Sequence, residues 1–388
     1  MRVALVHECI AGYHGSERVL AEMAAVYPEA PIFVTTCRRG VLDGTPLADR
    51  DLRASFLDRL PGLRDRHRLL LPLMPHAVER HDLRGFDVVL SSHHAAAHGV
   101  LTSADQLHLC YTHSPARYAW DLHHDHLPPE VAAPLRRYLL HRFRGWDVAA
   151  ASRVDTFAAN SRHVARRIAK TYRREAEVIH PPVDVGRFRP DRPREDYYVT
   201  LGRLVGYKNT GAAVEAFLGT SRRLVVIGDG PQRRAIARRV RRAGADGRNV
   251  ELAGALDDAA VADRLERARA LVFAAHEDFG MVPVEALAAG CPVIALGRGG
   301  VLETVGDGRS GVFFDRPTTA GIREAVERFE AQGVTAGPAE LHSDARAFSA
   351  EVFRGRLADW VQRRYATFLE SAFCPKPPSF SDRPPPRA

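Results

Sequence analysis

The stretch EDFGMVPVEALAAGCP, Glu277–Pro292, organises the second half of the chain. Apolar runs flank it on both sides, Leu271–Ala274 before it and Val293–Ala295 after it. The pattern predicts a strand, a loop over Phe279–Val282, a helix and a second strand. Pro283 suits the first helical turn, because its missing N–H would be unpaired there in any residue.

Two carboxylates, Glu277 and Glu285, bracket the loop, and we expect Glu285 in the first turn of the helix. A helix start offers free N–H groups and a positive dipole end, which together bind phosphate. The arrangement suits a phosphate-activated sugar, with one acid for sugar hydroxyls and the other for a ribose. The alternative interpretation is a capped amphipathic helix after a buried strand, with two surface acids.

Short apolar runs alternate with amphipathic segments along the whole chain, which predicts α/β architecture with parallel sheets covered on both faces. The expected strands are Val3–His7, Ile32–Thr36, Asp87–Ser91, Leu107–Thr112, Thr156–Asn160, Tyr197–Leu201, Leu224–Ile227, Val250–Ala253, Leu271–Ala274, Val293–Ala295 and Val312–Phe314.

A stretch rich in proline and charge, 182–196, lacks periodicity and is expected to link two domains, 1–181 and 197–349. A final helix is expected over 350–372. The tail, 373–388, holds six prolines and few apolar residues, so we expect it to be disordered.

Composition indicates a soluble globular protein, because 45% of the 388 residues are hydrophobic and 26% are charged. There is no apolar run of about 18 residues or more, and the apolar N-terminus is too short for a signal peptide. The five cysteines are far apart and favour reduced thiols in the cytoplasm. They are Cys9, Cys37, Cys110, Cys291 and Cys374.

The formal net charge is +8, and the positive residues cluster in three segments, 136–144, 162–174 and 233–242. Phosphorylated substrates, an anionic membrane surface and nucleic acid are all compatible with this charge. Solvated helix faces are the alternative. Aromatic residues do not interleave the basic runs as a single-strand binding platform requires, so we expect no nucleic-acid partner.

The loop LGRLVGYKN, Leu201–Asn209, follows the first strand of the second domain. Arg203 and Lys208 are placed to reach one anion from two sides, which suits a diphosphate. Two such cations offset charge on a departing nucleotide, as a divalent metal does elsewhere. The alternative is a loop with ordinary surface cations.

These two loops resemble the Glu-x7-Glu and Gly-Arg-x5-Lys signatures of retaining GT-B glycosyltransferases of family four. The resemblance implies two doubly wound, Rossmann-like domains facing across a cleft, and no cofactor. It implies that Glu277 holds the transferred sugar, Glu285 the ribose, and Arg203 and Lys208 the diphosphate of a GDP- or UDP-linked donor. The donor-binding residues that it implies are Gly15, Arg203, Lys208, Gly228, Phe279, Gly280, Met281, Val282 and Glu285.

Two further loops match the family. The stretch AGYHGSER, Ala11–Arg18, resembles the Gly-Gly-x-Glu loop, which places Gly15 opposite the donor phosphate. It departs from that pattern in having Tyr13 and His14 where a second adjacent glycine is common. The turn IGDGP, Ile227–Pro231, resembles the family's Gly-x-Gly turn beside the nucleotide.

The stretch YTHSPARYAW, Tyr111–Trp120, resembles a subgroup that acts on surface polysaccharides and lipid-linked sugars, often as mannosyltransferases. The resemblance places His113 near the transferred sugar, so His113 and Glu277 are the expected catalytic residues. Arg117, Tyr118 and Trp120 either shape the acceptor side or pack beneath it. It also implies a glycan or lipid-linked acceptor and favours a mannose donor.

Several histidines invite a metal interpretation, but only His94 and His98 have a helical i, i+4 spacing, and nothing completes a ligand set. We predict no metal site. The histidines considered are His93, His94, His98, His123, His124 and His126. Three other functions remain open: a GT-B sugar epimerase, a non-catalytic nucleotide-sugar sensor and a nucleic-acid-binding protein.

Overall fold

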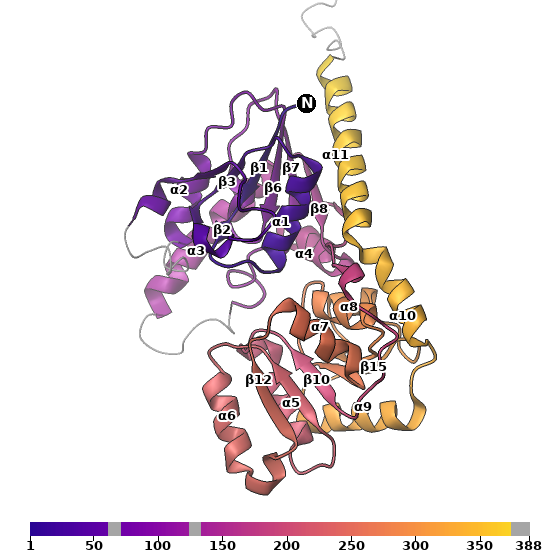
Figure 1. Ribbon diagram of the computed structural model, residues 1–388. Coiled ribbons are helices and arrows are strands. Elements are labelled where there is room, and N and C mark those ends of the chain that lie inside the picture. The colour runs from indigo at the N-terminus through magenta and orange to yellow at the C-terminus, as the bar shows by residue number, and fades with distance from the viewer. Residues whose placement is uncertain (61–70, 124–132, 374–388) are drawn as a thin grey trace, which may run out of the picture.

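The computed structural model describes residues 1–60, 71–123 and 133–373, which form two parallel sheets, each flanked by helices (Figure 1). The first sheet has the strand order β5-β3-β1-β6-β7-β8-β9. Its strands are β1 (Val3–His7), β3 (Ile32–Val34), β5 (Leu52–Ala54), β6 (Val88–His93), β7 (Leu107–Thr112), β8 (Thr156–Ala159) and β9 (Ala176–Val178). A separate small pair joins β2 (Cys9–Ile10) to β4 (Thr36–Cys37).

The second sheet has the order β12-β11-β10-β13-β14-β15. Its strands are β10 (Tyr198–Leu201), β11 (Leu224–Ile227), β12 (Val250–Gly254), β13 (Ala270–Phe273), β14 (Val293–Leu296) and β15 (Gly311–Phe314). The helices are α1 (Gly15–Val26), α2 (Met74–Glu79), α3 (Ala133–Ser152), α4 (Arg162–Tyr172), α5 (Thr210–Phe217), α6 (Arg233–Arg242), α7 (Asp258–Arg267), α8 (Met281–Ala288), α9 (Thr319–Gln332), α10 (Pro338–Ala345) and α11 (Ala350–Phe373).

The predicted fold class is confirmed, and every predicted strand lies within two residues of an observed one. Their apolar runs are mostly buried on both faces, as parallel strands are when helices cover the sheet. The prediction missed β5 and β9, the two edge strands of the first sheet. Each has three residues and is largely or partly exposed, so neither carries an apolar run.

The last helix, α11, leaves the second domain and lies along the first (Figure 1). Phe353, Leu357 and Trp360 belong to the same buried cluster as residues of β1 and α1. Arg354 adds an ion pair of 2.6 Å to Glu22 of α1. The predicted disordered tail lies outside the described residues from position 374 onward, as do His124 and His126.

The two domains also contact each other through a carboxylate. Glu303, at the end of the 3-10 turn η8 (Gly300–Glu303), accepts hydrogen bonds from the backbone N–H groups of Arg162 and His163 at 2.9 and 3.0 Å. It also contacts His180 at 3.1 Å. The second domain therefore caps the start of α4 in the first, which joins the segment after β14 to the helix that follows β8.

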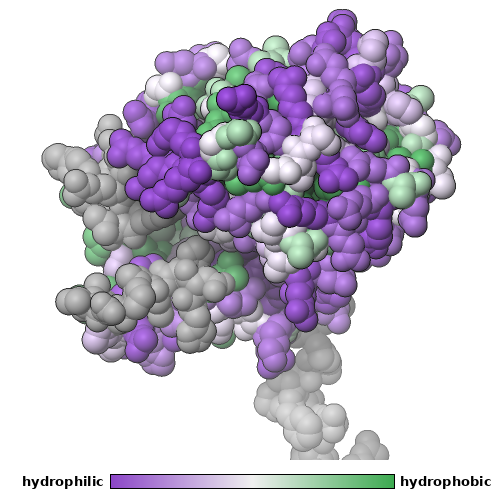
Figure 2. Space-filling view, turned by 90° about the horizontal axis from the view of Figure 1, so that it is seen from below, coloured by the Kyte–Doolittle hydropathy of each residue, from purple (hydrophilic) through white to green (hydrophobic). Residues whose placement is uncertain are grey.

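The surface seen from the end of the second domain is mainly hydrophilic (Figure 2). The arginines of α6 contribute to the exposed surface of this domain, and Ile236 alone of that helix is buried. Among the described residues, no helix is long and apolar enough to cross a membrane.

Candidate active site

Lys208 and Glu277 form an ion pair at the carboxyl ends of β10 and β13. Lys208 ends the short turn η6 (Gly206–Lys208), and Glu277 lies between β13 and α8. The Glu277 carbonyl accepts a hydrogen bond of 3.0 Å from the N–H of Gly300, which fixes its backbone. Both side chains are mostly buried. The loops that follow β10 and β13 therefore meet at one pair of opposite charges that neutralise each other.

Helix α8 begins at Met281, so Met281 and Val282 are helical rather than part of the loop. Glu285 consequently lies in the second turn and not, as predicted, in the first. Gly280 precedes the helix with φ of +86°, a conformation that favours glycine. The helix start, with its unpaired N–H groups, therefore follows Glu277 more closely than the sequence indicated.

Glu285 is buried, and Arg187 donates to its Oε1 at 2.9 Å. Burial raises the pKa of Glu285, and the charges of Arg187 and Arg18 act in the opposite direction. Arg187 also contacts Asp258 at 3.2 Å, and Asp258 accepts two hydrogen bonds from Arg18 at 2.7 and 2.9 Å. This chain of contacts links the second glutamate to α1 of the first domain, and no sequence pattern pointed to Arg187.

Two predicted glycines lie where neighbouring segments approach closely. A Cβ on Gly228 would come within 2.0 Å of the carbonyl oxygen of Gly202, so the turn after β11 touches the loop after β10. A Cβ on Gly15 would lie 3.2 Å from Sδ of Met281. The loop before α1 therefore faces the start of α8 across the domain boundary.

Arg203 and Phe279 differ in how they are placed. Arg203 is exposed. Phe279 is buried in the core of the second domain, 5.5 Å from the ring of His180 and 5.6 Å from that of Phe348. Only the backbone of Phe279 is thus available to a ligand in this conformation.

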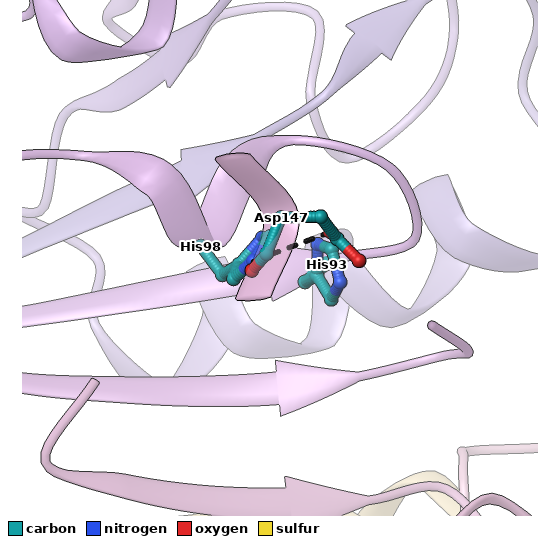
Figure 3. A group of neighbouring side chains, drawn as sticks. All are labelled: His93, His98 and Asp147. Atoms are coloured by element: carbon teal, nitrogen blue, oxygen red, sulfur yellow. Dashed lines mark hydrogen bonds and ion pairs between the residues drawn. The ribbon is translucent and has the colours of Figure 1, made fainter. Parts of the chain in front are cut away.

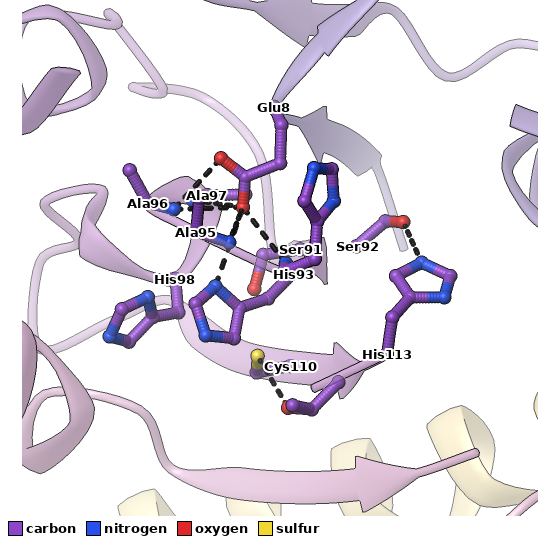
Figure 4. A network of polar contacts seen from close by, with 12 residues as sticks. Glu8, Ser91, Ser92, His93, Ala95, Ala96, Ala97, His98, Cys110 and His113 are labelled. Carbon is purple, nitrogen blue, oxygen red and sulfur yellow. Dashed lines mark hydrogen bonds and ion pairs between the residues drawn. The ribbon is translucent and has the colours of Figure 1, made fainter. Parts of the chain in front are cut away.

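His113 ends a short chain of polar side chains in the first domain, and Figure 4 shows its link to Ser92. Its Nε2 lies 2.8 Å from Oγ of Ser92, and that oxygen lies 3.0 Å from Nδ1 of His7. Nε2 of His7 faces Oε1 of Glu17 at 3.7 Å. His7 and Ser92 are fully buried at the ends of β1 and β6, where polar residues at a strand's carboxyl end could have marked them in the sequence.

Arg117, predicted either to shape the acceptor side or to pack beneath it, joins the two domains. It donates to Asp278 at 3.1 Å and to the carbonyl of His276 at 3.3 Å. Arg167 of α4 pairs with the same carboxylate. Ser161 caps α4 and also donates to the Asp278 carbonyl at 2.6 Å. Asp278, which the sequence analysis passed over, therefore anchors the double-glutamate loop to the first domain.

Tyr118 and Trp120 pack within the first domain. Tyr118 packs against the buried cluster that contains Leu140 and Phe143. Nε1 of Trp120 donates to the buried carboxylate of Asp147 at 2.7 Å. Of the two open interpretations of these aromatic residues, this placement favours packing beneath the acceptor side.

Asp147 belongs to a buried polar cluster with His93 and His98 (Figure 3). Their potential ligand atoms all lie within 4.8 Å of one another. Asp147 accepts hydrogen bonds from Tyr172 at 3.1 and 3.2 Å, and Nε2 of His98 lies 3.1 Å from the Asp147 carbonyl oxygen. Nδ1 of His93 and Nδ1 of His98 are buried without a hydrogen-bond partner, so these contacts pair only part of the cluster. Asp147 supplies the carboxylate that the sequence spacing did not offer. This cluster differs from the pair of His94 and His98 that the i, i+4 spacing in the sequence had indicated.

Glu8, between β1 and β2, supports this cluster. Its carboxylate accepts hydrogen bonds of 2.7–3.0 Å from the backbone N–H groups of residues 94–97 (Figure 4). The turn that follows β6 is thereby fixed, and with it the positions of His93 and His98. The pKa of Glu8 lies well below its ordinary value, because these bonds and His93 outweigh the effect of burial.

Two family models match the chain, one on each domain. The model described as Glycosyltransferase Family 4 matches residues 13–187, and that described as Glycosyl transferases group 1 matches residues 187–347. Together with the two parallel-sheet domains, these matches define a GT-B glycosyltransferase. The chain belongs to this family 4, group 1 class.

Among characterised relatives, the 2-deoxystreptamine N-acetyl-D-glucosaminyltransferase of Streptomyces fradiae is 29% identical over 262 residues, 62% of this chain and 58% of that protein. A GDP-mannose-dependent alpha-(1-6)-phosphatidylinositol monomannoside mannosyltransferase of Mycolicibacterium smegmatis is 32% identical over 195 residues, 43% of this chain and 50% of that protein. The match thus spans about half the length of each relative.

Solved structures share the fold at low identity. Anabaena HepE in complex with UDP has a TM-score of 0.66 and 15% identity, covering 94% of this chain and 100% of that one. Sucrose-phosphate synthase from Thermosynechococcus elongatus has a TM-score of 0.67 and 17% identity, with the same coverage. These likenesses support the architecture of both domains and their arrangement as GT-B halves.

Proposed function

We propose that the chain is a retaining glycosyltransferase, which moves a hexose from a nucleoside-diphosphate donor to a hydroxyl of a glycan or lipid-linked acceptor. The observation that carries this proposal is the ion pair of Lys208 and Glu277 beside the start of α8, with Gly15 opposite. It supplies a cation for phosphate and a carboxylate for sugar hydroxyls at one place. Family membership supplies the class of chemistry.

Donor binding rearranges this pair. In the free protein Glu277 neutralises Lys208. A diphosphate at the start of α8 competes for Lys208, with Arg203 and the N–H groups of Gly280, Met281 and Val282 as further donors. Glu277 is then released to accept hydrogen bonds from hydroxyls of the transferred sugar.

The ribose lies at the second glutamate. Glu285 is buried and already accepts one hydrogen bond from Arg187, and a carboxylate has room for several more. Ribose hydroxyls are neutral donors and so add to this arrangement without expelling Arg187. Glu285 thus contributes to donor affinity.

The proposed reaction needs no enzymic nucleophile. The bond between the anomeric carbon and the donor phosphate oxygen breaks, and the acceptor oxygen forms its bond on the same face. The acceptor proton passes to the departing phosphate oxygen. Lys208, Arg203 and the helix start stabilise charge on that phosphate, so no divalent cation or other cofactor is required. His113 contacts the transferred sugar.

The sugar and base of the donor are tested by a thermal-shift panel of UDP- and GDP-linked hexoses. A bound donor stabilises the fold by mass action, by roughly 2.7 kcal/mol at 100 times its dissociation constant. We favour GDP-mannose, which the Mycolicibacterium relative is named as using. Product analysis with and without an acceptor separates transfer from epimerisation, and no response to any nucleotide sugar would refute the proposal.

We place the enzyme in the cytoplasm, at the inner face of a membrane, where it acts in polysaccharide biosynthesis. On α3, four residues at i, i+3, i+4 and i+7 share one face: Leu135, Tyr138, Leu139 and Arg142. All four are exposed. An apolar stripe with adjacent arginines suits an anionic lipid surface. On α4, by contrast, Arg167 pairs with Asp278 and faces the second domain.

A further inference from the structure

We infer that Glu17, through His7 and Ser92, fixes which ring nitrogen of His113 carries its proton, so that Nδ1 of His113 faces the cleft as a hydrogen-bond acceptor. Three contacts carry this inference: Glu17 to His7 at 3.7 Å, His7 to Ser92 at 3.0 Å and Ser92 to His113 at 2.8 Å. The inference rests on the proposed function and assigns three positioning residues to it.

The directions of the two hydrogen bonds follow from the contact of Glu17 with His7, which at 3.7 Å is an ion-pair distance and not a hydrogen bond. A carboxylate attracts the N–H of the ring, so it favours the neutral form of His7 that carries hydrogen on Nε2. In that neutral form Nδ1 of His7 has a lone pair and accepts from the Ser92 hydroxyl. With its single hydrogen used, Ser92 accepts from Nε2–H of His113. The remaining nitrogen of a neutral His113, Nδ1, is left without hydrogen.

The surroundings keep the chain intact. Burial and then the neighbouring His94 hold the pKa of His113 well below its ordinary value, so the ring is neutral at pH 7. Burial raises the pKa of Glu17, but His7 and nearby N–H groups outweigh it and lower that pKa to about 2. Glu17 is therefore a carboxylate whenever the enzyme works.

A hydrogen-bond acceptor at Nδ1 of His113 selects a sugar hydroxyl as its partner. Nδ1 of His113 accepts a hydrogen bond from a hydroxyl, whereas the opposite tautomer would present a donor at the same place. Glu17 also accepts the backbone N–H of His14 at 3.0 Å and the Ser16 hydroxyl at 3.1 Å. One carboxylate thus connects the loop that faces α8 with the histidine of the first domain.

The substitution Glu17→Gln is expected to reverse the chain. The amide oxygen replaces the carboxylate oxygen that accepts from His14, so the NH₂ group faces His7 and donates to it. His7 then donates to Ser92, Ser92 donates to His113, and hydrogen moves to Nδ1 of His113. A wrong tautomer lowers turnover strongly elsewhere, so kcat should fall by about tenfold or more.

The test combines kinetics with ¹⁵N NMR of the histidine rings, assigned with His113→Gln. Wild type should show hydrogen on Nε2 of His113 and Glu17→Gln hydrogen on Nδ1, while Ser92→Ala should lose the single tautomer. The donor KM of Glu17→Gln should differ from that of wild type by no more than about twofold, because the substitution does not act on donor binding in the ground state. In the double variant, Glu17→Gln with Ser92→Ala, kcat should be no lower than in Glu17→Gln alone. Without the Ser92 hydroxyl, the reversal of the hydrogen bonds at His7 cannot reach His113.

Ser91→Ala is the matched control. Ser91 directly precedes Ser92 in β6, but its hydroxyl contacts His108 at 2.9 Å and not His113. It should leave kcat and the His113 tautomer unchanged. Hydrogen on Nδ1 in wild type, an unchanged tautomer in Glu17→Gln, or kcat losses that multiply in the double variant would each overturn the inference. The NMR result stands without turnover, so absence of transfer would count against the proposed function alone.

Discussion

At the scale of single residues, Lys208 and Glu277 neutralise each other in the free protein, while Glu285 is held by Arg187. The two glutamates therefore have different partners before any donor binds. Charge develops beside Glu277 as the bond to phosphate breaks, whereas the ribose beside Glu285 does not change during the reaction. Interactions that strengthen only in the transition state act on kcat, and uniform ones act on KM.

Glu277→Gln should therefore lose mainly kcat, by about a hundredfold or more, as other electrostatic deletions in active sites do. Glu285→Gln should mainly raise the donor KM and weaken binding of the free nucleoside diphosphate. Steady-state kinetics on both variants and calorimetry with the nucleoside diphosphate alone make the comparison. The opposite pattern would reverse the two roles, and full activity in both variants would remove the pair from the site.

Lys208→Ala should weaken donor binding and slow transfer together. A charge-assisted contact to phosphate is worth roughly 1.5–3 kcal/mol, so kcat/KM should fall at least about tenfold. The loss also leaves Glu277 mostly buried without its cation. Lys170→Ala, at an exposed position on α4, is the control and should keep wild-type kinetics. A folded Lys208→Ala enzyme with unchanged kcat/KM would contradict the assignment.

At the scale of elements, the start of α8 and the exposed face of α3 decide different properties. Helix α8 begins right after Gly280, so its free N–H groups lie beside Glu277 and Lys208. Helix α3 instead shows solvent an apolar stripe that includes Leu135 and Tyr138. The start of α8 concerns donor binding, and the exposed face of α3 concerns the place where the enzyme binds its acceptor.

The enzyme should co-sediment with vesicles of anionic lipid and not with neutral ones. About 1 M salt should abolish this binding, because the screening length then falls to ~3 Å. Leu135→Ser with Leu139→Ser should weaken it by removing the apolar stripe. Arg238→Glu with Arg241→Glu, on α6 of the other domain, is the control at a different basic surface and should bind as wild type. Equal recovery with neutral vesicles would indicate a soluble acceptor.

Dialysis against EDTA should leave turnover within about twofold, because the two cations and the helix start perform what a divalent metal would supply. The buried cluster of His93, His98 and Asp147 is the relevant element, because its potential ligand atoms lie within 4.8 Å of one another. Loss of activity restored by manganese would contradict this prediction, and His98→Gln would then show whether the cluster is responsible.

At the scale of the whole molecule, α11 and Glu303 tie the halves together. The helix starts beside the second domain and packs on the first, where Trp360 is fully buried with Phe353 and Leu357. Glu303 of the second domain caps the start of α4 in the first domain. Both contacts cross the domain boundary, so the facing edges of the two sheets depend on them.

Trp360→Ala should lower the free energy of unfolding by about 3–5 kcal/mol, the usual cost of emptying a large buried aromatic site. Chemical denaturation followed by circular dichroism measures the change. Asp359→Ala, one residue earlier and exposed, should have little effect. If Trp360→Ala were as stable as Asp359→Ala, α11 would not be part of the first domain's core.

The sequence by itself determined the α/β class, the strands and the position of the double-glutamate loop. Strands buried on both faces leave continuous apolar runs, and a loop after such a strand must lie at the sheet's carboxyl edge. Glu277 and Glu285 could be singled out because proline, glycine and spacing mark the start of α8. The exact start, Met281, was missed because the Gly280 conformation and the facing loop decide it.

Tertiary structure alone decided which distant residues meet. Arg187 reaches Glu285 across 98 positions, Arg117 reaches Asp278 across 161 and Arg18 reaches Asp258 across 240. No local pattern marks such partners, because an arginine on a surface helix and one in a domain interface look alike in sequence. The chain from Glu17 to His113 likewise exists only because β1 and β6 are neighbours, which brings His7 opposite Ser92 in the parallel register.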